Sequence, residues 1–420
     1  MFNKTIITDF FTTVSFRQAI SSFFLLFFRP SSLRFGDDIG KFEKNLKIYL
    51  GAGDSEIISM YDARSALYQA LKIIGVKSSD EVIINGYTCV SVSNAVIQSG
   101  AKPTYSDIDI ETLSFDIEKL KTSINKNTKV IVVQHTFGKT AHIEEIKKLA
   151  SENNIVVIED CAHSLGTEFN RKKTGTYGDF AIFSTGRDKV ISSVTGGFLL
   201  INNPIYFDSA IKAMEKLDIA NRLSCVRNLM YNIVGYKAYK TYDFLGLGKI
   251  IIYLSRKLKL INEILTPQEK KCKNNKLNFL LPNSLAYLAN KELEIIKEIT
   301  RKRRAISHLY DKELIPSIRS LLIEGGDEKI NTYRYPILLT DKKEKEEFVK
   351  YMKKNKVLLG TSWSGTNIVP IGSDLKAAKY QTGTCPVSED IASRIITLPN
   401  HILLKEKDIK RTIKHINNFF

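Results

Sequence analysis

Short, uninterrupted apolar runs recur along the first half of the chain and constrain its fold more than any other feature. Residues 130–133 read Val-Ile-Val-Val, and residues 155–158 read Ile-Val-Val-Ile. A strand that is apolar at consecutive positions is buried on both faces, as in a parallel sheet with helices on both sides. Segments with helical periodicity separate the runs, so the alternation predicts an α/β fold.

The predicted large domain spans residues 42–277 and contains a mostly parallel, seven-stranded sheet between helices. It includes a basic, helix-prone segment at residues 212–260, and the lysine-rich stretch at residues 270–276 reads as an exposed link. The seven predicted strands are residues 56–60, 81–84, 103–107, 129–134, 155–159, 179–183 and 197–201.

A change of pattern after this link predicts a second, smaller α+β domain over residues 278–420. Helical and strand signals alternate there with longer spacing than in the first part of the chain. The predicted elements are a long helix at 281–314, a strand at 333–339, a helix at 342–354, a strand at 394–398 and a last helix from about 406.

Residues 1–41 form a predicted N-terminal helical extension with a continuous apolar face. The residues Phe16, Ile20, Phe23, Phe24 and Phe27 share one side of this helix. The face predicts either packing on the body or on a partner subunit, or a peripheral anchor on a membrane surface. No apolar run reaches the roughly 20 residues that a spanning helix needs, and no small-residue cleavage site follows. Neither a transmembrane helix nor a signal peptide is therefore expected.

The formal net charge of +17 predicts that the protein attracts anions. Basic and aromatic residues are interleaved in the segment 212–260, which fits solvated helix faces over an apolar seam, nucleic acid or an anionic membrane. The cysteines are odd in number, widely spaced and without a close pair, which predicts neither a disulfide framework nor a zinc site. A reducing cytoplasm fits them best. They are Cys89, Cys161, Cys225, Cys272 and Cys385.

Two polar groups follow predicted strands at the edge where open α/β sheets bind ligands. Lys189 comes soon after the strand 179–183 and is surrounded by small residues, an environment in which a lysine can form a Schiff base with a carbonyl cofactor. Asp160 comes directly after the strand 155–159. Taken singly, each has an ordinary alternative: most loop lysines are solvated, and an aspartate there commonly caps a helix.

Several motifs in order give these residues a context. They include Asp62-Ala63-Arg64-Ser65-Ala66-Leu67, the segment 159–166, the segment 184–189, the paired glycines at 196–197, and Leu281-Pro282-Asn283. This ordered set resembles the DegT/DnrJ-type, StrS-like nucleotide-sugar aminotransferases, which are pyridoxal phosphate (PLP) enzymes of fold type I. The resemblance implies a cytoplasmic homodimer with PLP as its cofactor. Binding of nucleic acid is not expected. The resemblance also implies transfer of an amino group, with glutamate as the expected donor, to a nucleotide-linked keto sugar in surface polysaccharide or glycoconjugate biosynthesis.

By this resemblance, Lys189 holds the cofactor aldehyde and carries the proton that moves between donor and cofactor. Asp160 faces the pyridine nitrogen, where a carboxylate favours the protonated ring. His163 is expected to lie against the cofactor ring or its 3′-oxygen.

The resemblance also assigns a phosphate site. Arg64 and Ser65 stand just before an expected helix from about Ala66, whose N-terminus attracts the phosphate, and Ser184 adds a hydroxyl. Read without the resemblance, Ser65 is a simple helix cap. Asn278 matches an asparagine that in this family reaches the phosphate from the other subunit, which implies an obligatory dimer.

Two departures from the family pattern affect these expectations. Thr88-Cys89 stands where the family usually has an aromatic residue that stacks on the cofactor ring. Either Cys89 packs on the cofactor ring here, or Tyr87 takes the place of the aromatic residue. The segment 360–363 replaces the family segment that shapes the sugar pocket, so the sugar is not carried over.

Two other functions compete with the aminotransferase. PLP-dependent sugar dehydratases resemble this family but have histidine in place of the lysine, and Lys189 argues against that activity. A regulatory or membrane-binding member of the same fold would have lost its activity, yet both Lys189 and Asp160 are present.

Overall fold

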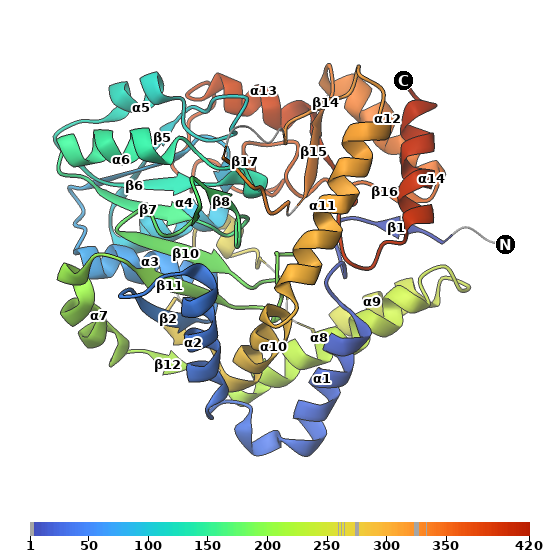
Figure 1. The fold of residues 1–420 in the computed structure, drawn as a ribbon, viewed down its shortest axis with the longest axis horizontal. Coiled ribbons are helices and arrows are strands. Elements are labelled where there is room, and N and C mark those ends of the chain that lie inside the picture. Colours follow the sequence, from blue (N-terminus) through green and yellow to red (C-terminus); the bar gives the residue numbers. More distant parts are fainter. Residues whose placement is uncertain are drawn as a thin grey trace.

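A nine-stranded sheet forms the framework of the protein (Figure 1). The computed structural model describes residues 4–258, 260–261, 263, 265–273, 277–322, 327–332 and 334–420. The strands of the sheet, in spatial order, are β12 (Asp218–Ile219), β13 (Phe279–Leu280), β2 (Glu56–Met60), β11 (Gly197–Ile201), β10 (Phe180–Ser184), β7 (Val156–Asp160), β6 (Thr128–Gln134), β3 (Glu81–Asn85) and β5 (Lys102–Ser106).

All seven predicted strands are present, and each boundary lies within one residue of the prediction. The two-residue strands β12 and β13 extend the sheet beyond β2, so the sheet has nine strands rather than seven. Strand β11 runs antiparallel to both of its neighbours, β10 and β2, whereas the pairs from β10 across to β5 are parallel. The carboxyl ends of β2, β3, β6, β7 and β10 therefore share one edge of the sheet.

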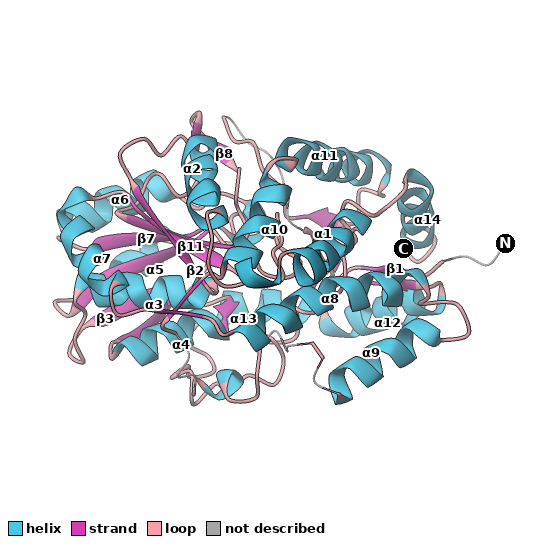
Figure 2. Cartoon of the chain, turned by 90° about the horizontal axis from the view of Figure 1, so that it is seen from below, coloured by secondary structure: helices cyan, strands magenta, loops and turns pink. Residues whose placement is uncertain are grey.

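Burial on both faces explains the uninterrupted apolar runs. Along β6, Val130 and Val132 point into a core that also contains residues of α3 (Ala63–Ile74) and α4 (Val90–Ser99). The alternate residues Ile131 and Val133 point into a separate core with α5 (Ile117–Ser123) and α6 (Ile143–Glu152). Side chains alternate across a strand, so both sets of positions must be apolar. Figure 2 shows helices on both sides of the sheet.

The C-terminal part contains a small antiparallel sheet with helices around it. The predicted helix 281–314 is instead two helices, separated at residues 294–295. Neither break residue is Gly or Pro, so the helical pattern continues through the break and could not reveal it. The predicted strand at 333–339 corresponds to β15, with residue 333 outside the described residues. The elements are α10 (Asn283–Leu293), α11 (Ile296–Glu313), β14 (Arg319–Ser320), β15 (Tyr335–Leu338), α12 (Lys342–Lys354), α13 (Pro386–Arg394), β18 (Ile395–Leu398) and α14 (Glu406–Asn417).

The predicted link at 270–276 is only partly described, since residues 274–276 lie outside the described residues. The described beginning of the link is not wholly exposed, because Cys272 is buried. The predicted domain boundaries at residues 41/42 and 277/278 stay predictions. Core residues from α2 (Asp38–Leu50), β10 and α10 belong to one continuous cluster.

The N-terminal residues pack against both parts of the chain. Strand β1 (Ile6–Ile7) pairs in parallel with β16 (Val357–Leu358) of the C-terminal part. Helix α1 (Phe16–Phe28) packs on α8 (Arg222–Lys240), as Figures 1 and 2 both show.

The packing face of α1 is opposite to the face that the apolar pattern predicts. The residues that α1 buries are Gln18, Ala19, Ser22 and Leu25. The phenylalanines of the predicted face are all exposed, and Phe27 keeps 65% of its surface in solvent. The prediction that this face packs on the body of the protein is therefore wrong for the described residues. No helix in the described part of the chain combines the length and the hydrophobicity needed to cross a bilayer.

A buried acid on α10 predicts a pH-dependent stability. Glu292 is 2% exposed, its Oε1 has no hydrogen-bond partner, and burial raises the pKa of this carboxyl to about 7, against the opposing effects of Gln18 and Arg17. Between about pH 4.5 and 7, the Glu292 carboxyl is therefore protonated in the folded state and ionised in the unfolded state. The free energy of unfolding falls as pH rises through this range. Glu292→Gln is expected to be more stable than the wild type at pH 8, by roughly 2 to 3 kcal/mol, with little difference at pH 4.5.

Urea unfolding at the two pH values measures this difference. Glu298→Gln, at an exposed position of α11, is the matched control and should show no pH-dependent gain. Equal behaviour of the two variants would contradict the assignment.

Candidate active site

The carboxyl edge of the sheet collects the polar groups that the sequence singles out. Asp160 is the last residue of β7, and Ser184 is the last residue of β10. Asp160 lies in register with Gln134 on one neighbouring strand and with Ile182 on the other. The loop that carries Lys189 begins directly after Ser184, so the lysine and the aspartate belong to adjacent strand ends.

Asp160 is a buried carboxyl group with a perturbed acidity. Its side chain is 6% exposed, and Oδ1 accepts a hydrogen bond of 3.0 Å from the Ala162 amide. Burial raises the pKa of Asp160, while the Ala162 amide and the positive charge of Lys189 act in the opposite direction. A cationic group bound beside this carboxyl would favour its ionised form further.

Hydrogen bonds within the lysine loop close it into a defined shape. The Thr185 amide donates to the Gly196 carbonyl, and the Ser193 amide donates to the Thr185 carbonyl, both at 2.8 Å. The hydroxyls of Thr185 and Ser193 are also hydrogen-bonded to each other at 2.7 Å. Half-buried Lys189 lies between these two anchor points.

Contacts from distant segments hold the lysine loop from outside. Asp188 has a left-handed backbone conformation (φ 59°), and its buried carboxylate accepts a hydrogen bond of 2.6 Å from the Thr12 hydroxyl. On the other side, the Arg303 guanidinium of α11 donates to the Lys189 carbonyl at 3.1 Å. The N-terminal segment and the C-terminal part therefore both fix the position of the lysine.

An aromatic cluster surrounds His163. The imidazole lies parallel to the Phe137 ring, with centroids 5.8 Å apart, and edge-on to Trp363 at 4.6 Å. Its Nδ1 accepts the Phe137 amide at 3.3 Å. Burial lowers the pKa of His163 well below its usual value, and the charges of Lys189 and Arg334 act in the same direction. The ring is therefore neutral.

The two candidates for the cofactor-stacking position have different surroundings. Tyr87 is fully buried, and its hydroxyl donates to the Trp363 carbonyl while its ring lies edge-on to the Trp363 ring. Cys89 ends β4 (Thr88–Cys89) and is half-buried, with its thiol 3.4 Å from the Ser91 hydroxyl. Tyr87 is already engaged in the aromatic cluster, which leaves Cys89 as the more accessible of the two.

Helix α3 begins at Ala63, three residues earlier than predicted, because Asp62 rather than Ser65 caps it. The Asp62 carboxylate accepts the Ser65 amide at 2.9 Å and the Ser65 hydroxyl at 2.8 Å. Arg64 forms ion pairs with Asp62, at 3.1 Å, and with Glu269. The side chains of Arg64 and Ser65 are therefore engaged within the chain.

The N-terminus of α3 nevertheless lies at the same edge as Ser184. A Cβ at Gly197 would lie 2.5 Å from the Ala63 amide nitrogen, so glycine is needed for β11 to approach the start of the helix this closely. A Cβ at Gly186 would meet only the Ser184 hydroxyl, at 3.2 Å, which leaves open space beside that hydroxyl. A helix N-terminus, a hydroxyl and open space are suited to a phosphate group.

Asn278 directly precedes β13, which pairs with the end of β2 just before α3. It is exposed, and its Oδ1 accepts a hydrogen bond of 2.9 Å from the Gln69 side chain of α3. Its expected reach into the site of another subunit stays a prediction.

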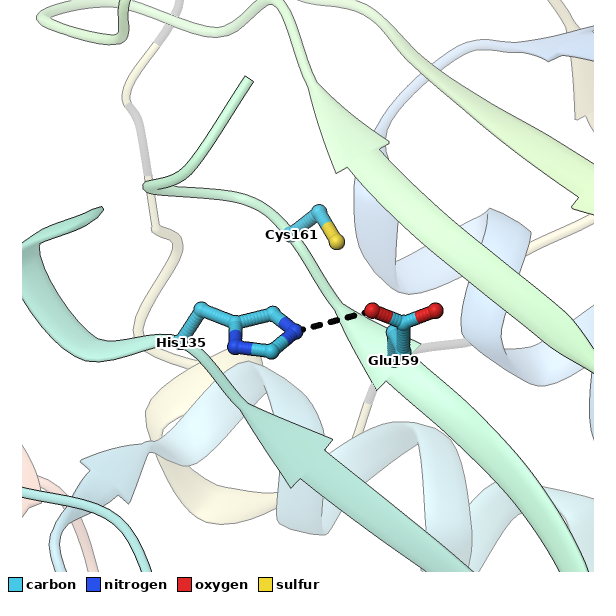
Figure 3. A group of neighbouring side chains, drawn as sticks. All are labelled: His135, Glu159 and Cys161. Carbon is cyan, nitrogen blue, oxygen red and sulfur yellow. Dashed lines mark hydrogen bonds and ion pairs between the residues drawn. The ribbon is translucent and has the colours of Figure 1, made fainter. Parts of the chain in front are cut away.

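A cluster that the sequence did not single out lies directly beneath Asp160. His135, Glu159 and Cys161 place one nitrogen, oxygen or sulfur atom each within 4.8 Å of one another (Figure 3). His135 Nε2 and Glu159 Oε2 are 3.0 Å apart, and His135 Nδ1 accepts the Ala141 amide at 3.1 Å. The imidazole is therefore the neutral form with its proton on Nε2.

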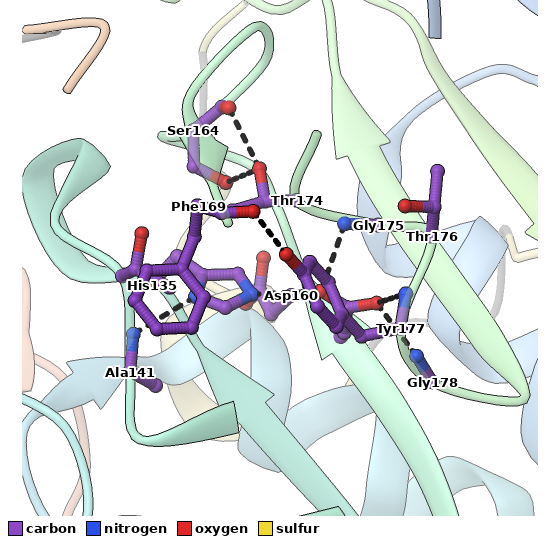
Figure 4. Close-up of polar contacts among 12 residues, drawn as sticks. His135, Ala141, Asp160, Ser164, Phe169, Thr174, Gly175, Thr176, Tyr177 and Gly178 are labelled. Carbon is purple, nitrogen blue, oxygen red and sulfur yellow. Dashed lines mark hydrogen bonds and ion pairs between the residues drawn. The ribbon is translucent and has the colours of Figure 1, made fainter. Parts of the chain in front are cut away.

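Glu159 accepts further hydrogen bonds from a backbone turn, whose residues 175–178 are labelled in Figure 4. The Gly175 amide donates to Oε2 at 2.8 Å, and the amides of Tyr177 and Gly178 donate to Oε1 at 2.7 Å. With His135, this makes four donors around one fully buried carboxylate. The lone pairs that a metal ion would need are already occupied, so the cluster is structural.

Near the site, the structure brings together Asp9, Arg334 and Trp363, which the sequence analysis did not connect. Arg334 forms an ion pair with Asp9, and the same carboxylate accepts the amides of Thr361 and Ser362 at 2.6 and 3.0 Å. Trp363 follows immediately and covers His163. No local signal indicates these contacts, because Asp9 lies more than 300 positions from Arg334 and from Thr361, and His163 and Trp363 are also far apart in the chain.

The sequence model of the DegT/DnrJ/EryC1/StrS aminotransferase family matches residues 27–240 and 260–417. The chain belongs to this family. Its predicted identification as an aminotransferase is thereby confirmed.

Individual relatives cover nearly the whole chain at low identity. GDP-perosamine synthase of Vibrio cholerae is 24% identical over 92% of this chain and 91% of its own length. The dTDP-3-amino-3,6-dideoxy-alpha-D-galactopyranose transaminase of Aneurinibacillus thermoaerophilus is 23% identical over 91% and 90%. Among solved structures, the aminotransferase PseC of Helicobacter pylori superposes with a TM-score of 0.75 at 20% identity and covers 100% of this chain and 99% of its own. The predicted fold of this family is confirmed by this likeness.

Substitution of Glu159 tests its structural role. In Glu159→Gln, the amide group must face at least one of the backbone donors, so charge-assisted hydrogen bonds worth about 1.5 to 3 kcal/mol each are lost. We expect the free energy of unfolding to fall by at least about 3 kcal/mol in urea denaturation. Glu168→Gln, which removes only partly exposed ion pairs with Lys173 and Lys329, should cost less than about 1 kcal/mol. Equal losses in the two variants would contradict this role for Glu159.

Proposed function

We propose that this protein uses PLP to transfer an amino group from glutamate to a keto group of a nucleotide-linked sugar. The observation that carries the proposal is the position of Lys189 in a fixed loop at the sheet edge, where its charge acts on the buried carboxyl of Asp160. A primary amine and a buried acid at adjacent strand ends form the donor set that PLP requires.

The residues present fit PLP by their chemistry. Lys189 supplies the amine for the aldehyde, Asp160 the carboxylate for the ring nitrogen, and the N-terminus of α3 with Ser184 the site for the phosphate. When bound, PLP supplies an electron sink that makes the Cα proton of the amino-acid donor acidic. The solved sugar aminotransferase Spr1654 of Streptococcus pneumoniae is described in a PLP form and in a PMP form, which supports the same cofactor here.

Each residue then has a defined task. Lys189 takes the proton from the donor and returns it, because its amine lies in the closed loop between Thr185 and Ser193. Asp160 keeps the ring nitrogen protonated, and the positive nitrogen in turn favours the ionised form of this buried acid. Neutral His163, whose Nδ1 accepts the Phe137 amide, can donate a hydrogen bond from Nε2 without adding a charge.

The nucleotide-linked sugar is proposed from charge and from the relatives. A diphosphate is attracted by a chain with a net charge of +17. The names of the two curated relatives refer to GDP- and dTDP-linked sugars. A role in surface polysaccharide or glycoconjugate synthesis follows as part of the same proposal. The five cysteines are free, which fits the reducing cytoplasm where sugar nucleotides are made.

Replacement of the lysine tests the proposal. Lys189→Ala is expected to fold, to bind PLP without forming a borohydride-reducible adduct, and to lose transamination, because no other amine is placed to move the proton. The measurement is amino-sugar formation from GDP- and dTDP-linked keto sugars with glutamate, together with the visible absorbance of the purified protein. Lys173→Ala, in an ion pair with Glu168 away from the edge, is the matched control. Turnover by Lys189→Ala at the wild-type rate would refute the function.

We also propose a homodimer in which Asn278 contacts the phosphate bound by the partner. Asn278→Ala should lower activity, and co-expression with Lys189→Ala should restore it, because each mixed dimer then contains one intact site. Sedimentation of the wild type should show a dimer. An active monomer, or no complementation between the two variants, would show that Asn278 acts within its own chain.

A further inference from the structure

Two helices expose continuous apolar faces on one side of the molecule. In α1, the exposed residues recur on one face and include Phe27 at 65% and Phe28 at 69% exposure. Helix α9 (Leu247–Lys257) presents a second face, in which Ile250 is 52% exposed and Tyr253 63%. We call the following residues the α1–α9 surface: Phe16, Ile20, Phe23, Phe24, Phe27, Phe28, Phe244, Leu245, Leu247, Ile250, Tyr253, Leu254 and Leu258.

The orientation of α1 is fixed by its polar side. Gln18 donates to the Ser192 carbonyl at 3.0 Å, and Asn232 of α8 donates to Gln18 at 3.3 Å and to Ser22 at 2.9 Å. Rotation of the helix to bury its phenylalanines would break these buried hydrogen bonds. The buried side of the helix therefore combines polar Gln18 and Ser22 with Ala19 and Leu25, whereas its phenylalanines face outward, unlike the apolar side of a helix that packs on a soluble core.

Both helices lie largely outside the residues that the family sequence model matches. The family match excludes residues 1–26 and 241–259, which contain most of α1 and all of α9. Helix α8 contacts both and lies between them, as Figures 1 and 2 agree. The apolar faces thus lie mostly outside the family match, on two helices that flank α8, which lies within the match.

Positive charge surrounds the α1–α9 surface. Neither α1 nor α9 contains an acidic residue, whereas α9 carries Lys249, Arg256 and Lys257, all exposed. No carboxylate in the described part of the chain forms an ion pair with these three side chains. Asp243, the acid just before α9, already accepts the amide and hydroxyl of Thr5.

We propose that the α1–α9 surface binds the interface of an anionic lipid bilayer. The phenylalanine and leucine side chains enter the acyl boundary, Tyr253 lies at the headgroup level, and the basic side chains contact lipid phosphates. A second copy of the chain complements the surface poorly. Two-fold contact would bring two copies of this positively charged surface into one interface, whereas anionic headgroups neutralise the charge.

Vesicle flotation with the full chain tests the proposal. Wild-type protein should float with vesicles of phosphatidylcholine that contain about one third phosphatidylglycerol, and much less with pure phosphatidylcholine. The apolar variants Phe24→Ser/Phe27→Ser and Ile250→Ser/Leu254→Ser should each weaken binding at least about tenfold. Arg256→Gln/Lys257→Gln should weaken it about fivefold per residue and flatten its salt dependence, because each basic residue near the surface contributes about 1 kcal/mol.

Matched variants elsewhere on the surface control for general effects. Ile205→Ser replaces an isoleucine that is 74% exposed, and Lys353→Gln/Lys354→Gln removes two exposed charges of α12. Both should float like the wild type, and all variants should keep the wild-type thermal midpoint and transaminase rate. Absence of flotation with anionic vesicles, or equal flotation of every variant, would overturn the proposal. So would a change of oligomeric state in the α1 and α9 variants without any change in lipid binding, since the surface would then join copies of the chain.

Discussion

The buried carboxylate of Glu159 is the interaction on which the arrangement of the site depends. A charge with no exposed surface is tolerated only when it is fully hydrogen-bonded, and Glu159 has four donors. These donors join β7 to the end of β6 and to the turn at residues 175–178. Because strand side chains alternate between faces, the next residue, Asp160, points to the opposite side and into the site.

The proposed catalytic edge is assembled from three distant parts of the chain. The sheet provides Asp160 and Ser184, whereas Thr12 and Arg303 hold the lysine loop from the N-terminal segment and from α11. The same layer of helices that carries the α1–α9 surface contacts this loop, since the Arg187 guanidinium lies 3.9 Å from the Tyr231 ring of α8. The N-terminal segment therefore helps to hold the loop that carries Lys189.

Much of the fold was predictable, and the errors have specific physical causes. The strands were found because burial on both faces requires consecutive apolar residues, a local property of each segment. The start of α3 was misplaced because its cap depends on the extended backbone of Asp62, which brings that carboxylate to the Ser65 amide. The predicted packing face of α1 was wrong. An apolar pattern shows which face avoids water, but it does not show whether protein or another surface covers that face.

The sequence by itself determined the alternation of strands and helices, the family, and the placement of Lys189 and Asp160 after adjacent strands. These features depend on residues close together in the chain. Only the tertiary structure showed that Glu159, the neighbour of Asp160, is saturated by three backbone amides and His135. It alone joined Asp9 to Arg334, since that ion pair spans most of the chain. Such contacts form only when the whole chain is folded, because their energy depends on burial and on donors from remote segments.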